Sequence, residues 1–434
     1  MAEYTAPEAT AATAAERMGR YRWVICALLF AATAINYVDR QMIGVLKPTI
    51  SAELGWDDTT YSTIVIWFQL AYAVGYLSFG KVVDLLGARF GYAIAFTIWT
   101  AAHMLHGAAR SAVQFSMVRF LLGVGESGNF PAGLKAVSEW FPARERALAT
   151  GIFNAGSNVG AILTPIIVPY IVVTLSLGWR AAFVITGLFS LIWLVAWVVM
   201  YRSPRNKAGV SAAEIAHIES DPADVGEKIG WTKLLTYRET WAFALGKFLT
   251  DPIWWLYLFW LPDFLSKRYH LDLVHFGPPL VVIYLLSDLG SIAGGWSSSR
   301  LIRGGMEAGA ARKVTMLGCA ILVTPIFFAQ YVDSLWASVA IIGLATAAHQ
   351  AFSANIYTLP SDMFPRKAVG SVVGIGGFAG AIGGALMSAF IGEVLKATGS
   401  YTLIFAVAGT VYLLAMVVIH ALVPRVRRVD LVEA

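Results

Sequence analysis

Charged residues are scarce in this chain: Asp, Glu, Lys and Arg together make up 14% of its 434 residues. A typical soluble protein carries about 25%, whereas 58% of this sequence is hydrophobic, with 24 Phe and 15 Trp. The apolar residues form runs of about 20, the length that a helix needs to cross a hydrocarbon core of ~30 Å. This composition excludes a water-soluble enzyme and predicts an all-α membrane protein.

Several other features are missing from the sequence. It has only two cysteines, Cys26 and Cys319, and both fall inside apolar runs, so no disulfide framework is expected. Residues 1–20 lack the apolar core of a signal peptide. The chain contains no metal-ligand spacing, no nucleophile paired with a base and no Walker-type phosphate loop. No basic cluster suits nucleic acid. We therefore expect no enzymatic activity, no metal, no cofactor and no nucleic-acid partner.

Hydropathy predicts twelve membrane-spanning helices, with the longest polar interval at residues 202–239 dividing them into six and six. The predicted spans are residues 22–47, 60–81, 90–109, 112–135, 148–173, 180–201, 240–265, 276–300, 313–331, 336–358, 368–393 and 400–423. We therefore predict two six-helix bundles joined by a solvated, partly helical linker and flanked by short tails. The segments are an N-terminal tail at 1–21, bundles at 22–201 and 240–423, the linker at 202–239 and a C-terminal tail at 424–434.

The basic residues sort by loop. If both termini are inside, the cytoplasmic segments hold twenty-two Lys and Arg residues and the external side holds six, namely Lys47, Arg110, Arg180, Lys267, Arg268 and Lys396. Such a bias orients membrane proteins with the basic loops in the cytoplasm. The sequence thus predicts a multi-pass membrane protein with both termini cytoplasmic.

The two halves of the chain repeat each other. Residues 138–144 (SEWFPAR) follow the fourth span, and residues 361–367 (SDMFPRK) follow the tenth. Each segment precedes a Gly-rich helix, which carries Gly151 in the first half and Gly374 in the second. Because both halves start on the same side, this is a parallel repeat. That arrangement is typical of two bundles related by an axis along the membrane normal.

A short motif joins the second and third spans and consists of Gly80, Asp84, Gly87 and Arg89. Gly80 allows close helix contact, Asp84 can accept hydrogen bonds at a helix N-terminus, and Arg89 can bind a carboxylate when the cytoplasmic side is closed. Together with twelve spans and a parallel repeat, this motif resembles the signature of the major facilitator superfamily. The resemblance implies a cytoplasmic gate at these four residues.

Within that superfamily the chain resembles the anion:cation symporter family. The similarity lies in residues 36–40 (NYVDR) of the first span and 119–126 (RFLLGVGE) of the fourth; residues 131–142, 151–157 and 251–255 are similar to hexuronate transporters. The resemblance implies uptake of sugar-acid monoanions, above all hexuronates, together with protons. The alternatives are a symporter of another organic anion, such as an aldonate, glucarate or an aromatic acid, and a transporter-like nutrient sensor. The expected partners are a small organic anion, protons and the lipid bilayer, and we expect a monomer.

Four ionisable residues interrupt the apolar spans: Asp39 and Arg40 in the first, and Arg119 and Glu126 in the fourth. A charge at this depth costs roughly 3 kcal/mol, so such residues usually mark an ion or substrate pathway. Asp39 and Arg119 fall at similar depths, which predicts an ion pair between them. Arg40 projects about 100° away from Asp39 and can present a planar fork to a substrate carboxylate. We assign proton coupling to Asp39, Arg119 and Glu126. The alternative is a fixed ion-pair network that only stabilises the bundle.

Further polar and aromatic side chains on the spans are candidates for substrate binding. They are Tyr37, Tyr72, Ser157, Asn158, Trp255, His349, Asn355 and Tyr357. Aromatic packing and interhelical hydrogen bonds are alternative roles for them, and Trp260, with Tyr257, fits an aromatic belt at the external interface. Lys247 and Asp251, four residues apart, can simply pair with each other. Residues 374–384 (GIGGFAGAIGG) carry no polar side chain, so this helix leaves the sugar specificity unexplained.

Overall fold

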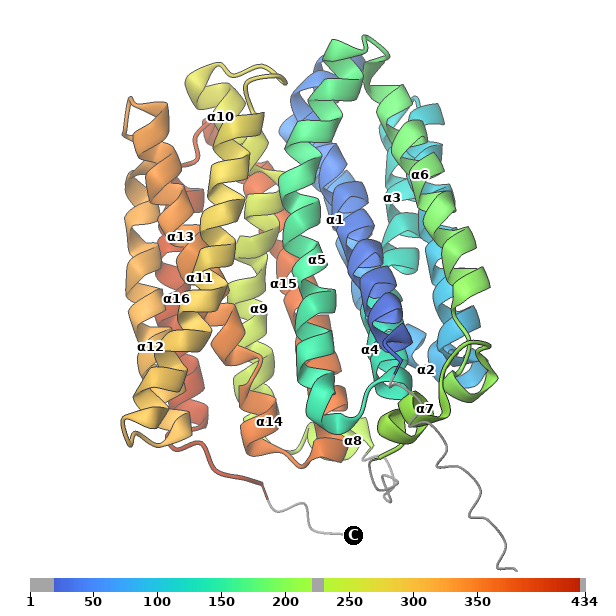
Figure 1. Ribbon diagram of the computed structural model, residues 1–434. Helices are drawn as coiled ribbons and strands as arrows, with labels where there is room; N and C mark the ends of the chain where they lie inside the picture. Colours follow the sequence, from blue (N-terminus) through green and yellow to red (C-terminus); the bar gives the residue numbers. More distant parts are fainter. Residues whose placement is uncertain (1–18, 221–229, 430–434) are drawn as a thin grey trace, which may run out of the picture.

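The computed structural model describes residues 19–220 and 230–429, and all regular structure in these segments is helical. Most of the predicted N-terminal tail (1–18), the linker residues 221–229 and the C-terminal residues 430–434 lie outside the described residues. The helices form two bundles that stand side by side, one from each half of the chain (Figure 1).

The first bundle contains α1 (Tyr21–Leu54), α2 (Asp58–Leu105), α3 (Ala112–Glu126), α4 (Asn129–Trp140), α5 (Ala143–Pro169) and α6 (Gly178–Met200). The second contains α9 (Arg238–Phe259), α10 (Leu261–Tyr269), α11 (Gly277–Arg303), α12 (Ala308–Val323), α13 (Leu335–Ile356), α14 (Leu359–Met363), α15 (Arg366–Thr398) and α16 (Thr402–Leu422). The linker forms α7 (Ala212–Ile218) and α8 (Trp231–Leu234). We call the end at which α1 begins and α16 ends the termini face, and the end that carries α10 the distal face (Figure 1).

The twelve predicted spans are confirmed. Nine elements of the described chain are long and apolar enough to cross a membrane. One of them, α2, contains two spans, because Gly87 with φ 73° reverses the chain inside it. The pairs α3–α4 and α9–α10 supply the other two spans. Each of these pairs is a single predicted span that the structure breaks, at Ser127–Gly128 and at Trp260.

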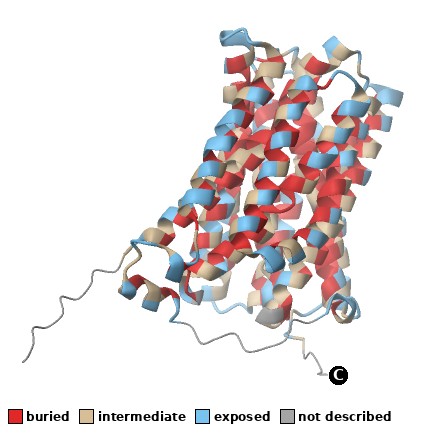
Figure 2. Ribbon diagram, turned by 90° about the vertical axis from the view of Figure 1, so that its right-hand side faces the viewer, coloured by how far each residue is buried: buried red, intermediate tan, exposed pale blue. Residues whose placement is uncertain are grey.

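Burial follows the expectation for helices in lipid. Buried residues are concentrated toward the interior of the molecule, while exposed residues lie along the outer faces of the helices (Figure 2). On α6 the exposed side chains include Phe189, Ile192, Val195 and Val199, which suit contact with acyl chains. Glycines allow close helix packing inside the bundle. A Cβ atom at Gly156 or Gly160 of α5 would overlap the backbone of α1, so these glycines fix the position of the helix that carries Asp39 and Arg40.

The linker is less solvated than predicted. Glu214 of α7 is buried, and its carboxylate accepts hydrogen bonds from the backbone N–H groups of Tyr21 and Arg22. It also lies 3.2 Å from Nη1 of Arg22. The linker carboxylate thereby satisfies N–H groups that the first turn of a helix leaves free, and it attaches α7 to the start of α1.

Candidate functional site

The intramembrane charges converge where α1 meets α3. Nε of Arg40 donates to Oε2 of Glu126 at 2.8 Å, and Nη2 of Arg40 donates to Oδ1 of Asn36 at 2.9 Å. Nη2 of Arg119 donates to the backbone carbonyl of Arg40 at 3.1 Å. Arg40, Arg119 and Glu126 are all buried. The charged residues singled out from the sequence therefore do form one cluster.

The predicted pairing within this cluster is wrong. Asp39 does not contact Arg119; its Oδ1 lies 3.2 Å from Nε2 of His103 on α2, and the same nitrogen lies 2.8 Å from Oγ1 of Thr186 on α6. The guanidinium of Arg119 instead lies 4.6 Å from the centre of the Phe68 ring. The reason is the rotation of α1, which turns Asp39 toward α2 and Arg40 toward α3. Adjacent helical residues cannot share one direction.

Arg40 lies at the boundary between the two bundles. Its guanidinium carbon is 4.8 Å from the ring centre of Tyr37, 4.7 Å from that of Tyr72 and 5.3 Å from that of Trp255. Trp255 belongs to α9 of the second bundle, so this arginine is shared between the halves. Aromatic faces attract a guanidinium and leave its edge available for hydrogen bonds. The structure thus brings Tyr37, Tyr72 and Trp255 together with Arg40.

The other polar candidates are distributed more widely. Oγ of Ser157 donates to the carbonyl of Asn154 at 2.7 Å, and Asn158 of α5 lies against Asp288 of α11 across the bundle boundary. Nδ2 of Asn355 donates to the carbonyl of Gly294 at 3.1 Å and to that of Ala351 at 2.9 Å. The Asn355 amide therefore joins α13 to α11 and is not directed at the boundary.

The last two candidates lie in the second bundle. His349 is buried, its Nδ1 is hydrogen-bonded to the hydroxyl of Tyr412, and its ring stacks on Trp254 with centres 5.3 Å apart. Tyr357 is 42% exposed, and Nζ of Lys247 lies 3.8 Å from its ring centre. His349 is thus occupied inside the bundle, whereas Tyr357 remains accessible.

The predicted gate motif lies at the termini face, in the turn between the two arms of α2. Gly87 has the positive φ that the turn requires. Asp84 lies 3.8 Å from Nζ of Lys135. Nη2 of Arg89 donates to the carbonyl of Val198 on α6 at 2.6 Å. Among the described residues, Arg89 therefore binds a backbone group of its own bundle and not a carboxylate.

An ion network that the sequence did not reveal joins the bundles at the distal face. Nζ of Lys47 on α1 lies 2.6 Å from Asp58 of α2 and 2.5 Å from Asp263 of α10. Lys267 of α10 lies 2.8 Å from Asp58 and 3.0 Å from Asp263. The hydroxyl of Tyr61 also donates to the carbonyl of Phe259 at 2.8 Å. We call Lys47, Asp58, Asp263 and Lys267 the distal network. It links the two bundles at the distal face.

Trp260 and Tyr257 do not form an aromatic belt, so that prediction is wrong. Both side chains are buried. The Trp260 ring packs against Tyr61 with centres 5.0 Å apart and lies 4.9 Å from Nζ of Lys47. The end of α9 faces the other bundle and not the lipid, which explains the difference.

Two residues were missed for identifiable reasons. His103 is an ionisable residue inside the apolar run 90–109, and this position alone qualifies it as a member of the intramembrane ionisable group. Lys47 was counted among the external loop residues, yet it is 3% exposed and belongs to the last third of α1. When the end of a helix is polar, a hydropathy plot ends the span too early. A buried residue such as Lys47 is then assigned to the loop.

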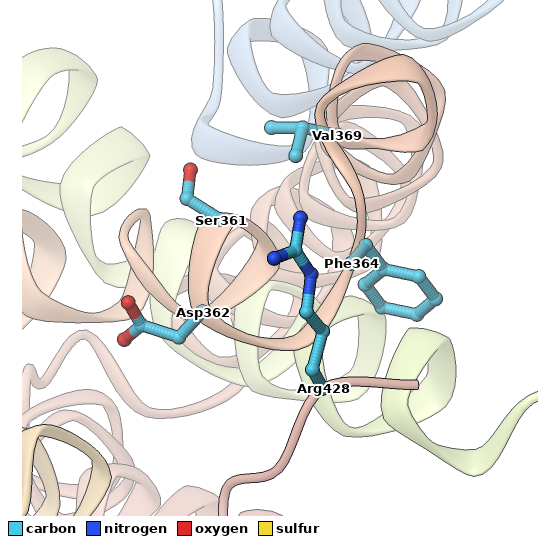
Figure 3. Close-up of a pocket in the computed structure, with 5 residues that line it drawn as sticks. All are labelled: Ser361, Asp362, Phe364, Val369 and Arg428. Carbon is cyan, nitrogen blue, oxygen red and sulfur yellow. The ribbon is translucent and has the colours of Figure 1, made fainter. Parts of the chain in front are cut away.

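A separate pocket of about 490 Å³ lies at the termini face of the second bundle (Figure 3). Ser361, Asp362, Phe364, Val369 and Arg428 line it. The backbone N–H of Val429 donates to the carbonyl of Met363 at 2.7 Å, which holds the end of the described chain beneath α14. This pocket is remote from the intramembrane charges. In the described part of the chain no group of three or more His, Cys, Asp or Glu side chains is placed to hold a metal ion.

Comparisons with known proteins agree with this architecture. A family model of the Major Facilitator Superfamily matches residues 29–388. The chain is 31% identical over 405 residues to the hexuronate transporter of Escherichia coli (strain K12), covering 92% of this chain and 93% of that protein. It is 28% identical over 422 residues to the D-galactonate transporter of Escherichia coli O6:H1, covering 94% and 96%. A solved bacterial homologue of the human lysosomal transporter Spinster, in an inward-facing and occupied conformation, matches with a TM-score of 0.70 at 17% identity, covering 93% and 95%.

Proposed function

Because this chain belongs to the Major Facilitator Superfamily, whose members are membrane transporters, we propose that it is a proton-coupled symporter of sugar-acid monoanions. Hexuronates such as glucuronate and galacturonate are the proposed substrates. The similarity to the hexuronate and D-galactonate transporters over more than nine-tenths of the chain supports an organic acid as the cargo. The proposed coupling ion is the proton.

The observation that carries the proposal is the buried contact of 2.8 Å between Arg40 and Glu126 at the boundary of the bundles. A substrate carboxylate that binds Arg40 must compete with Glu126 for the same guanidinium. Protonation of Glu126 weakens its hold on Arg40 and frees the arginine for the substrate. The site keeps its net charge only if a proton and a monoanion arrive together. Since an uncompensated buried charge is costly, the pair couples the two events.

Asp39 and His103 form a second proposed place for the proton. Both side chains are buried, they lie 3.2 Å apart, and Asp39 directly precedes Arg40 in the chain. Neither oxygen of Asp39 accepts a hydrogen bond among the described residues. A buried carboxylate without a donor is costly to keep ionised, so we propose that this pair shares a proton. Arg119 fixes the backbone of Arg40 from α3 and links the two places.

The proposed transport cycle is alternating access by rocking of the two bundles about the Arg40 site. The distal network holds the distal face shut, while the exposed Tyr357 marks access from the termini face. We propose that the termini face is cytoplasmic, in a bacterial inner membrane, and that residues 80–89 help to close it. The units that move are the proposed bundles 22–201 and 240–423, joined by the linker 202–239, in a monomer.

Uptake by purified protein in proteoliposomes tests the proposal. Labelled galacturonate should accumulate when the interior is alkaline, and labelled glucose, which has no carboxylate, should not. Arg40→Ala should abolish binding. Glu126→Gln should retain binding and exchange but lose accumulation driven by the gradient, because an amide cannot carry the proton. Glu53→Gln is the matched control, since Glu53 pairs with Arg180 at the periphery of the first bundle. If Glu126→Gln still concentrates galacturonate, the coupling role of Glu126 is wrong.

A further inference from the structure

The helix α15 faces the bundle boundary with glycines where a polar side chain would be expected in a sugar-binding site. A Cβ atom at Gly380 would overlap the carboxylate of Asp251, and one at Gly383 would overlap the carbonyl of Phe248. At Gly384 it would lie 2.6 Å from the ring of Trp255. The glycines therefore make room for α9, which carries two charged polar groups on this side of the boundary.

Those polar groups are Lys247 and Asp251. Nζ of Lys247 lies 2.7 Å from Oδ1 of Asp251, and the side chains are 2% and 21% exposed. A lysine and an aspartate one turn apart contribute little stability to a helix, far less than the insertion of two charges into a membrane span requires. Pairing within α9 alone does not explain these residues, and the accessible part of Asp251 indicates that the pair faces a path for solutes.

The position of the pair relates it to Arg40. Lys247, Asp251 and Trp255 are spaced by four residues, so they lie along one face of α9. The last of them is in contact with Arg40 of the first bundle, 5.3 Å from its guanidinium carbon. The rise along α9 from Asp251 to Trp255 is about 6 Å, a distance comparable to the length of a six-carbon chain. Tyr357, against Lys247, leaves the far end of this row accessible.

We propose that Lys247 and Asp251 bind the hydroxyl groups of a sugar acid whose carboxylate lies on Arg40. The inference rests on the proposed function and names its substrate class. Each hydroxyl both donates and accepts a hydrogen bond, and the pair offers ammonium donors beside a carboxylate acceptor. The pair is neutral as a whole, so it suits the polyol end of a monocarboxylate. A second carboxylate at this place would face Asp251 and be repelled.

The proposal makes a prediction of opposite sign for two ligands. Asp251→Asn removes the carboxylate acceptor and leaves the charge of Lys247 unpaired. Galacturonate, a monoacid, should then bind about tenfold more weakly, as expected for the loss of a charge-assisted hydrogen bond. Galactarate, a diacid of similar size, should bind as well as before or more tightly. The ratio of the two Kd values should therefore change by about tenfold or more in favour of the diacid.

Direct binding to the purified full-length protein in detergent measures both Kd values. Lys247→Gln/Asp251→Asn is the second variant, because it replaces the ion pair by two amides that still donate and accept. It should keep the preference of the wild type for galacturonate within a few-fold, and it decides the matter if Asp251→Asn does not fold. Asp333→Asn is the matched control, since that carboxylate is 98% exposed and pairs with Arg268 at the distal face.

The outcomes are distinct. A wild-type protein that binds no sugar acid overturns the proposed function itself, and this inference with it. Suppose instead that the wild-type protein binds galacturonate, and that Asp251→Asn raises the Kd values for both acids by the same factor or changes neither. This result overturns only the inference about the pair. If the double variant shows the same change in the ratio of the two Kd values, the shape of the side chains and not their charge is responsible. This result also overturns the inference about the pair.

Discussion

At the scale of single residues, the proposed function depends on which partner each buried charge has. The sequence identified Asp39, Arg40, Arg119 and Glu126 by their cost in a membrane, and the structure places them in one cluster. It did not identify the partners, because the spacing of residues along a helix does not fix the rotation of that helix. The rotation of α1 about its axis decides whether Arg40 or Asp39 faces Glu126, since the two side chains project about 100° apart.

The geometry of the Arg40 guanidinium leads to the first prediction. Arg40→Lys keeps the positive charge but loses the planar fork that donates to Glu126 and to Asn36 together. We expect the Kd for galacturonate to rise about tenfold or more, with a smaller loss than in Arg40→Ala. Titration of the purified protein with galacturonate measures both. Equal affinity of the lysine variant and the wild type would show that a simple positive charge suffices at this position.

The second prediction concerns a surface carboxylate and its pH dependence. Asp57 caps α2: its Oδ1 accepts from the backbone N–H of Thr60 at 2.7 Å, and its Oδ2 accepts from the hydroxyl of Thr59 at 2.7 Å. Interactions with the side chains of Thr60 and Thr59 and with the backbone N–H of Thr60 lower the pKa of Asp57 to about 2. A lowered pKa means that the stabilisation is present above the unfolded value of about 3.9 and is lost as the pH falls through about 2.

Asp57→Ala should therefore lower the free energy of unfolding by about 0.5–2 kcal/mol at pH 7, and the difference should shrink as the pH falls from 4 toward 2. Thermal unfolding of both proteins in detergent across this range measures it. Asp333→Ala, which removes an exposed carboxylate that caps no helix, is the control. A difference that stays constant from pH 7 to the lowest pH would contradict an ionic cap.

At the scale of helices, hydropathy located every span but not the breaks within them. The twelve spans follow from long apolar runs, which any rotation or bend preserves. The break after Glu126 occurs at Ser127–Gly128, inside the short polar run 126–129, which a hydropathy average over the whole apolar segment does not resolve. Similarly, Pro252 lies inside a continuous α9, and the break comes later, at Trp260. These details depend on contacts with neighbouring helices, which a single sequence does not contain.

The same limit applies to the site. Tyr37 and Tyr72 are predicted from their hydroxyl groups and from the resemblance to the family, and Trp255 from its aromatic face. Asn355 had the same appearance, yet its amide is used by carbonyls of α11 and α13. The partners of His103 and the members of the distal network required knowledge of which helices are neighbours. Residue type therefore predicts membership of the polar interior, and tertiary contacts decide the role.

The third prediction is made at this scale and concerns the contact of α5 with α1. A Cβ atom at Gly160 would overlap the carbonyl of Ala34 and lie 2.7 Å from Cβ of Tyr37. Gly160→Ala should therefore push the two helices apart, destabilise the protein by about 1–3 kcal/mol and weaken substrate binding through Tyr37. Gly151→Ala on the same helix is the matched control, because nothing lies within 4 Å of its added Cβ. Melting temperature and galacturonate affinity are the measurements. Identical behaviour of the two variants would contradict the role assigned to this contact.

At the scale of the whole molecule, the two bundles are joined at the distal face by ions and at the centre by aromatic contacts with Arg40. The distal network combines two lysines and two aspartates, drawn from both bundles. Its charges balance while the distal face is shut, and they must separate when that face opens. An exposed ion pair contributes little to such an equilibrium, but Lys47 and Asp263 are both buried, so their separation carries a larger free-energy difference.

The fourth prediction follows from this difference. Asp263→Asn leaves Lys47 and Lys267 with Asp58 as their only carboxylate in the distal network, which weakens the closed distal face. We expect the population with an open distal face to rise about tenfold for each 1.4 kcal/mol lost. The separation of the bundles can be measured by double electron–electron resonance between two spin labels. The labels are placed at Val113 of the first bundle and Val274 of the second, which are both exposed near the distal face. The distribution of distances should gain a longer component.

Arg180→Met is the control for this prediction. It breaks the ion pair between Arg180 and Glu53, which lies at the same face but within the first bundle, and it should leave the distances unchanged. If both variants lengthen the distances equally, a general loosening of the distal face is responsible, and not the contact between the bundles. If neither variant lengthens them, the closed distal face depends on the packing of Tyr61 against Trp260 instead.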